Sequence, residues 1–265
     1  MKGKITSIIM IDLVFLLLLF ISGGFSGGIG LLLRIFAYAL PIAIGLAVIS
    51  RTGRGGVLRL LPSGEGFLSV LPLLAPTVLV IGGISALTSL ILSLFGAQNQ
   101  TDLSSHLIVE IAEHALIPAF FEELLFRYIP LRLLLPHSKR GALLISAILF
   151  ALGHVSLFQI PYALFAGLIL GFVTLLSGSV LPAMILHFVN NTVSVLWMKY
   201  APASHGVILA VLLVLLIPSL VFIIRGRKRY LEAISGAASG DIPWSLPEVW
   251  IFCGLCILIS MIGLM

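Results

Sequence analysis

Charged residues are scarce in this chain. Asp, Glu, Lys and Arg make up 9% of its 265 residues, whereas about 25% is usual for soluble globular proteins. Hydrophobic residues make up 60% of the chain. This composition excludes a soluble enzyme, a disordered chain and a nucleic-acid-binding protein. Cysteine is also nearly absent: Cys253 and Cys256 cannot build a disulfide framework or, alone, complete a tetrahedral metal site.

Long apolar runs take the place of the missing charges. A helix needs roughly 20 apolar residues to cross a bilayer core. Dividing the sequence at charges and at Gly, Pro and Ser clusters predicts an all-α polytopic transmembrane helical bundle of about eight or nine spans. The spans are expected near residues 5–23, 29–49, 68–95, 106–131, 141–158, 160–177, 180–199, 206–224 and 248–265.

Lys and Arg predict the orientation of these spans, because positive loops stay in the cytoplasm. A cytoplasmic N-terminus places 12 of the 15 basic residues on that side. They are Lys2, Lys4, Arg51, Arg54, Arg59, Arg132, Lys139, Arg140, Arg225, Arg227, Lys228 and Arg229. The expected location is the cell membrane, as a multi-pass protein. The segment from Arg225 to Pro247 is a candidate interfacial segment, although a simple cytoplasmic anchor is the favoured interpretation.

Several ionisable side chains fall inside the apolar runs. Each costs about 2.5–3.5 kcal/mol to insert, so each indicates a function and requires a partner. Glu123 and Arg127 are one helical turn apart and can neutralise each other. Glu122 has no local cation and must find partners on other helices. The remaining residues of this kind are Asp12, Glu110, Glu113, His114, His154 and His187, with Arg34 near a span end, where it can snorkel.

The depth of these groups predicts that some of them meet. Counting about 1.5 Å per residue from the cytoplasmic ends, Glu122, His154, His187 and Asn191 all lie roughly 10–20 Å into the membrane. A carboxyl, two imidazoles and an amide at one level suit a hydrolytic site, with a base for water and donors for an oxyanion. Packed helices also use Glu–Arg and His–Asn pairs simply to satisfy one another, so spacing alone leaves both interpretations open.

The order of the motifs favours the catalytic interpretation. Glu122 to Arg127 reads EExxxR, Phe150 to His154 reads FxxxH, and His187 to Asn191 reads HxxxN. This series resembles the CAAX protease and bacteriocin-processing (CPBP or Abi) family of intramembrane proteases, which includes the type II CAAX prenyl endopeptidases. The resemblance covers about a quarter of the chain. It implies a helical core of about eight spans with an intramembrane catalytic cavity.

The resemblance also implies roles for these residues. Glu122 and His154 would activate water, His187 and Asn191 would stabilise the oxyanion, and Glu123 and Arg127 would support them. The catalytic core is then expected at 105–200, between N-terminal helices in 1–104 and C-terminal helices with a basic linker in 201–265. Members of this family are often described as metalloproteases, so Glu122, His154 and His187 form an alternative zinc site. Without an HExxH motif, and with asparagine a poor zinc ligand, the metal-free mechanism is favoured.

The expected activity is therefore membrane endopeptidase activity on a peptide or lipidated protein in the lipid bilayer. A non-proteolytic scaffold or bacteriocin-immunity factor of the same fold is the alternative, and a transporter with a glutamate relay is a third. The GxSG sequence that ends in Gly27 falls in a loop and is interpreted as a connector. Gly167 and Gly171 are expected to let another helix approach closely. Cys253 and Cys256 are expected to pack as small apolar residues.

Overall fold

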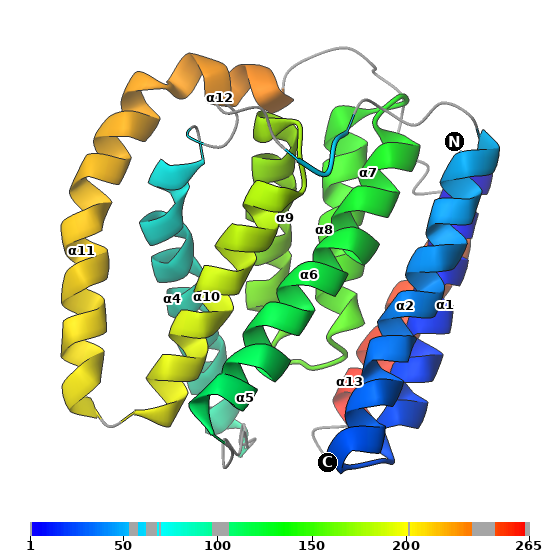
Figure 1. Cartoon of the computed structure of the whole chain (residues 1–265), viewed down its shortest axis with the longest axis horizontal. Coiled ribbons are helices and arrows are strands. Elements are labelled where there is room, and N and C mark those ends of the chain that lie inside the picture. Colours follow the sequence, from blue (N-terminus) through cyan, green and yellow to red (C-terminus); the bar gives the residue numbers. More distant parts are fainter. Residues whose placement is uncertain are drawn as a thin grey trace.

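The computed structural model shows a bundle of helices (Figure 1). It describes residues 2–52, 58–61, 68, 70–96, 106–200, 202–234 and 247–262. Within these ranges no strand forms, and a single bridge joins Arg59 to Ser179. This confirms the predicted all-α class. Arg54 and the predicted loop at 98–105 lie outside the described residues.

The helices follow one another closely along the chain. Their bounds are α1 Lys2–Gly23, α2 Gly27–Thr52, α4 Leu74–Leu94 after a 3₁₀ turn at Leu71–Leu73, α5 Leu107–Ile111, α6 Ile117–Glu123, α7 Ile129–Leu134, α8 Lys139–Gly153, α9 Ile160–Ser177, α10 Leu181–Lys199, α11 Pro202–Arg225, α12 Arg227–Ile234 and α13 Pro247–Ile262. Two π-helical turns, Ala112–Leu116 and Leu124–Tyr128, join α5, α6 and α7 into one run.

Six helices of the described chain are long and apolar enough to cross a membrane. They are α1, α2, α4 with its 3₁₀ turn, α9, α10 and α11. The other three predicted spans are helical as well, but α8 and α13 are shorter and the run from α5 to α7 is interrupted by its π turns. The protein is a multi-pass membrane protein.

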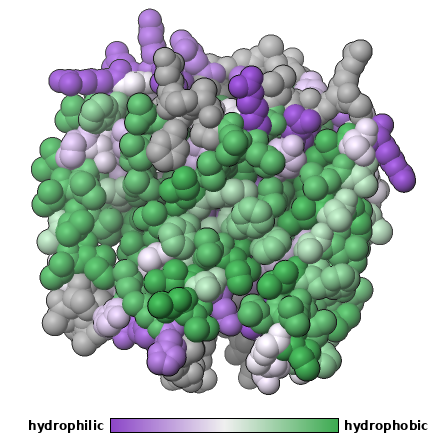
Figure 2. Space-filling model, in the orientation of Figure 1, coloured by the Kyte–Doolittle hydropathy of each residue, from purple (hydrophilic) through white to green (hydrophobic). Residues whose placement is uncertain are grey.

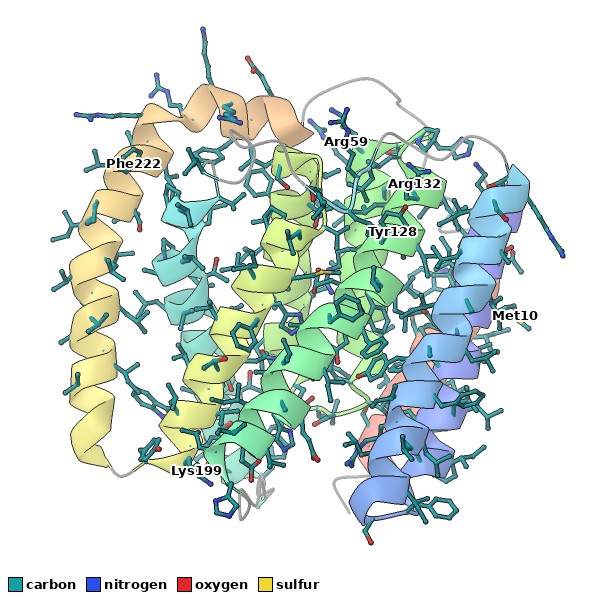
Figure 3. All side chains as sticks on the ribbon, viewed as in Figure 1. Met10, Arg59, Tyr128, Arg132, Lys199 and Phe222 are labelled. Carbon is teal, nitrogen blue, oxygen red and sulfur yellow. The ribbon has the colours of Figure 1, made fainter. Side chains whose placement is uncertain are left out.

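The surface has the layered polarity of a membrane protein. Figure 2 shows a hydrophobic belt around the molecule, with hydrophilic residues gathered at its two ends. Helices alternate in direction, so the start of α1 and the ends of α2, α7 and α11 share one end of the bundle (Figure 1). Arg59 and Arg132 lie at that end and Lys199 lies at the other (Figure 3). The basic residues therefore gather where the sequence predicts them to gather.

Helix α12 follows α11 and lies across the basic end of the bundle (Figure 1). The side chains of Arg227, Lys228 and Arg229 are exposed there. Tyr230 packs against Phe172 of α9, with ring centroids 6.0 Å apart. The basic part of the linker is thus a short helix on the surface at this end of the bundle.

Small residues let α8 and α9 approach each other closely. A Cβ added to Gly167 would lie 2.9 Å from the Cα of Ala147, and one added to Gly171 would meet the Leu143 side chain. The predicted close approach is therefore confirmed, and it occurs within this chain. This contact anchors the helix that carries His154.

Asp12, the two cysteines and Ser26 lie apart from the motif residues. Asp12 is buried in α1, and neither carboxyl oxygen has a hydrogen-bond partner among the described residues. Cys256 is buried and Cys253 half-buried, and both pack in the apolar core. Ser26 is exposed in the turn between α1 and α2, which agrees with its interpretation as part of a connector.

Candidate active site

The predicted motif residues converge from three parts of the bundle. Glu122 and Glu123 end α6, and Arg127 lies in the π turn that follows. Phe150 and His154 stand at the end of α8, and His154 is its C-cap residue. His187, Asn190 and Asn191 lie about two to three turns from the start of α10. These three parts are 20 to 60 residues apart in sequence, and the fold brings them together.

A buried ion pair forms the rigid base of this group. Arg127 Nη1 lies 3.0 Å from Glu123 Oε1, and both side chains are 0% exposed. The pair is the one expected from the i, i+4 spacing. His187 Nδ1 lies 2.9 Å from the same Glu123 oxygen. An ionised carboxylate only accepts hydrogen bonds, so His187 donates from Nδ1 and turns its Nε2 away from Glu123.

Glu122 faces the other side of this imidazole. Its Oε2 lies 3.8 Å from His187 Nε2, and its side chain is 12% exposed. The phenol of Tyr38 on α2 donates a hydrogen bond to Glu122 Oε1 at 2.9 Å. As the sequence predicts, Glu122 finds its partners on other helices. The two consecutive glutamates thus flank one histidine, with Glu123 at Nδ1 and Glu122 near Nε2.

Phe150 is the side chain around which the other groups are arranged. The Arg127 guanidinium lies over its ring, 3.8 Å from the centroid. The rings of His154 and His187 meet it edge-on, with centroids 4.8 Å and 5.7 Å away. His154 Nδ1 lies 2.8 Å from the Phe150 carbonyl oxygen, which fixes Nδ1 as the donor and leaves Nε2 as an acceptor. The first and last residues of the FxxxH motif are therefore in direct contact.

Two prolines explain why side chains of neighbouring helices hydrogen-bond to the backbone of the run from α5 to α7. Pro118 and Pro130 have no N–H, so the carbonyls of His114 and Phe126, four residues earlier, each lose their usual donor. Each carbonyl bonds a side chain from another helix instead. The amide of Asn191 on α10 donates to the His114 carbonyl at 3.2 Å, and the Ser146 hydroxyl on α8 donates to the Phe126 carbonyl.

A second group of polar residues extends from the site towards the end of the bundle opposite the N-terminus. His114 Nε2 lies 3.3 Å from Glu110 Oε2 on the preceding turn. Arg34 of α2 pairs with Glu113 at 3.5 Å, with 43% and 31% of the side chains exposed. Arg34 therefore has an acidic partner and does not depend on snorkelling alone. Asn190 donates to the Asn191 side-chain oxygen at 3.2 Å, which orients that amide.

Comparison with known proteins finds the same family that the three motifs resemble. Residues 104–193 match the family model described as type II CAAX prenyl endopeptidase Rce1-like. This segment contains all three motifs.

Residues 104–193, about a third of the chain, are thus similar to the Rce1-like family.

No curated protein and no solved structure matches the chain with significance. Similarity to this family indicates that the function is of the CAAX-type intramembrane protease kind. It runs from just before α5 to the middle of α10 and so includes the buried ion pair, Phe150 and both histidines. Tyr38 and Arg34 lie outside it, on α2.

The zinc alternative does not fit the arrangement of side chains in the Rce1-like segment. Across the described part of the chain, no three His, Cys, Asp or Glu side chains are grouped as a metal ion would require. We therefore derive no step through a metal.

Sequence reasoning missed Tyr38 as a contact of Glu122. A tyrosine in an apolar run carries no charge, so it lacks the insertion cost that marks a charged residue as needing a partner. Its position one helical turn after Arg34 was the available clue, because it places both polar groups on one face of α2.

Proposed function

We propose that this protein is an intramembrane endopeptidase that hydrolyses a peptide bond of a membrane-associated or prenylated, CAAX-type substrate. The observation that carries the proposal is the placement of Glu122 and Glu123 on opposite sides of His187, with Arg127 buried against Glu123. Neutralising Arg127 requires only one carboxylate, that of Glu123. The additional carboxylate, Glu122, is partly exposed and is available to act on water.

Glu122 is the proposed base. Its Oε2 and His187 Nε2, 3.8 Å apart, are too distant for a direct hydrogen bond, and the proposed water bridges them from one side, about 2.8 Å from each. Glu122 Oε2 takes one proton from this water, and the water oxygen attacks the carbonyl carbon of the substrate. His154 presents the acceptor nitrogen Nε2 from the end of α8 and helps to orient the water.

His187 and Asn191 are the proposed oxyanion donors. As an imidazolium, His187 donates from Nδ1 to Glu123 and from Nε2 to the oxygen that receives the carbonyl π electrons. Asn191 uses one N–H on the His114 carbonyl and has a second one for the oxyanion. When the tetrahedral intermediate collapses, the C–N bond breaks and the leaving amine takes the proton from Glu122.

A quenched fluorescent peptide library tests this proposal, with and without a farnesylated cysteine. Purified protein in detergent is compared with Glu122→Gln and His154→Ala, and with Glu232→Gln on the exposed surface of α12 as a control. We expect cleavage in the wild type and the control and a loss of about 10²- to 10⁴-fold in the two site variants. The farnesyl dependence assigns the substrate class. Equal rates in all four proteins would favour the scaffold or immunity function.

Metal dependence is tested in the same assay. The proposed mechanism expects turnover to be unchanged after treatment with a zinc chelator. A reversible loss of turnover that added zinc restores would contradict it.

A further inference from the structure

Helix α2 contributes a side chain to the site that the proposed mechanism does not yet use. We propose that Tyr38 is a positioning residue that holds the Glu122 carboxylate in its reactive orientation. Its phenol donates to Glu122 Oε1 at 2.9 Å across 84 residues of sequence. The catalytic consequence rests on the proposed function, whereas the positioning itself does not.

The Tyr38 ring packs against two other aromatic rings. Phe15 of α1 lies on one side, with ring centroids 4.9 Å apart, and Phe121 of α6 stacks on the ring at 5.6 Å and an interplanar angle of 20°. Tyr38 is 8% exposed. A ring held in this way has little freedom, so its hydroxyl has a fixed direction, and that direction is towards Glu122.

A glycine on the same face of α2 allows the helix to approach closely enough. A Cβ added to Gly45 would lie 2.4 Å from Cδ1 of Ile129 on α7. Ile42, one turn after Tyr38, is buried on this face as well. The buried stripe of α2 thus packs against the run that carries Glu122, and Tyr38 is its polar member.

The hydrogen bond makes the two oxygens of Glu122 unequal. Oε1 is occupied by the phenol, and Oε2 points towards His187 Nε2. With Oε1 held, the carboxylate cannot rotate to offer either oxygen at random. Tyr38 thereby selects Oε2 as the atom that takes the proton from water.

Kinetics of Tyr38→Phe test the catalytic consequence. This substitution removes only the hydroxyl and keeps the ring contacts with Phe15 and Phe121. On a farnesylated CAAX reporter peptide we expect kcat to fall about 10- to 100-fold, the range for losing a hydrogen bond to a charged group. KM should stay close to the wild type, because no substrate contact changes. The midpoint of thermal unfolding should fall only by the effect of one lost hydrogen bond, because the packing of the ring is kept.

Tyr128→Phe is the matched control, since Tyr128 lies over Arg132 near the basic end of the bundle (Figure 3). It should keep wild-type kcat. A Tyr38→Phe kcat within twofold of the wild type, or a rise in KM that accounts for the whole loss, would overturn the positioning role.

Infrared spectroscopy reads the contact without any turnover. The difference spectrum between wild type and Glu122→Gln isolates the carboxyl band of Glu122. We expect this band to shift in Tyr38→Phe and not in Tyr128→Phe. An unshifted band overturns the inference even where a peptide is cleaved. A shifted band in a protein that cleaves nothing keeps the positioning and rejects the protease.

If Tyr38→Phe does not fold, a label on Tyr38 itself can detect its hydrogen bond to Glu122. A 3-fluorotyrosine at position 38 gives one ¹⁹F resonance, which should move when Glu122→Ala removes its acceptor. A resonance that does not move contradicts the contact.

Discussion

Phe150 links the groups of the site at the scale of single residues. Its ring carries the Arg127 guanidinium on its face and two imidazoles at its edges, and its carbonyl orients His154. A cation over a desolvated ring is stabilised by about 2 kcal/mol. The phenylalanine of the FxxxH motif is thus explained by its contacts, because a smaller residue would leave the guanidinium and the histidines without a common support.

The buried Arg127–Glu123 pair gives the first prediction. Arg127→Met leaves a carboxylate that is 0% exposed without its cation, and we expect the free energy of unfolding to fall by about 3–5 kcal/mol. Unfolding in detergent by heat or denaturant measures the change. Arg140→Met, at an exposed position of α8, should change it little. Adding Glu123→Met to Arg127→Met should recover part of the lost free energy of unfolding. A double variant whose loss equals the sum of the losses in the two single variants would contradict the pairing.

Sequence reasoning reached the ionisable residues of the site and Asn191, but it missed Tyr38. The cost of a charge in an apolar run made Glu122, Glu123 and Arg127 visible, and the i, i+4 rule paired two of them. Tyr38 was invisible because a phenol fits an apolar run at little cost. Its role depends on which helix packs against α6, and no local pattern encodes that.

The interrupted run from α5 to α7 determines the site at the scale of elements. Each π turn is followed by an Ile-Pro pair that begins the next α-helical segment. The proline removes a backbone donor, and the freed carbonyl receives a side chain from α10 or α8. The sequence shows the prolines but does not show which side chains replace the lost hydrogen bonds, since those come from distant segments.

The contact between α8 and α9 gives the second prediction. Gly167→Ala places a methyl group within about 3 Å of Ala147 backbone atoms, and we expect a loss of about 1–3 kcal/mol in the free energy of unfolding. Gly82→Ala in α4 is the control, because nothing lies within 4 Å of its added Cβ. A helical alanine there should be neutral or slightly stabilising. Equal effects at the two positions would show that α8 and α9 are not in close contact.

The distribution of basic residues describes the whole molecule. Arg51, Arg59, Arg132 and the residues of α12 share the end that holds the N-terminus, and the bundle between the ends is apolar (Figures 1 and 2). The sequence predicted this arrangement well, because apolar length and loop charge are nearly sufficient to define a membrane bundle. It predicted about eight or nine spans, whereas six helices of the described chain are long and apolar enough to cross a membrane, since π turns and short helices cannot be read from hydropathy.

The third prediction concerns orientation. In a background with Cys253 and Cys256 replaced by alanine, Lys228→Cys should react with a membrane-impermeant maleimide only from the cytoplasmic side. Phe25→Cys, in the turn between α1 and α2, should react only from the outside. Labelling of whole cells and of inverted vesicles measures both. The reverse pattern would contradict the cytoplasmic N-terminus.

Cleavage of a farnesylated reporter peptide in H₂¹⁸O, followed by mass spectrometry, tests the central claim most directly. If Glu122 activates water, wild-type protein yields a new carboxyl terminus that carries one ¹⁸O atom, and Glu122→Gln yields about 10²- to 10⁴-fold less of this product. Product formed by Glu122→Gln at the wild-type rate would contradict the account.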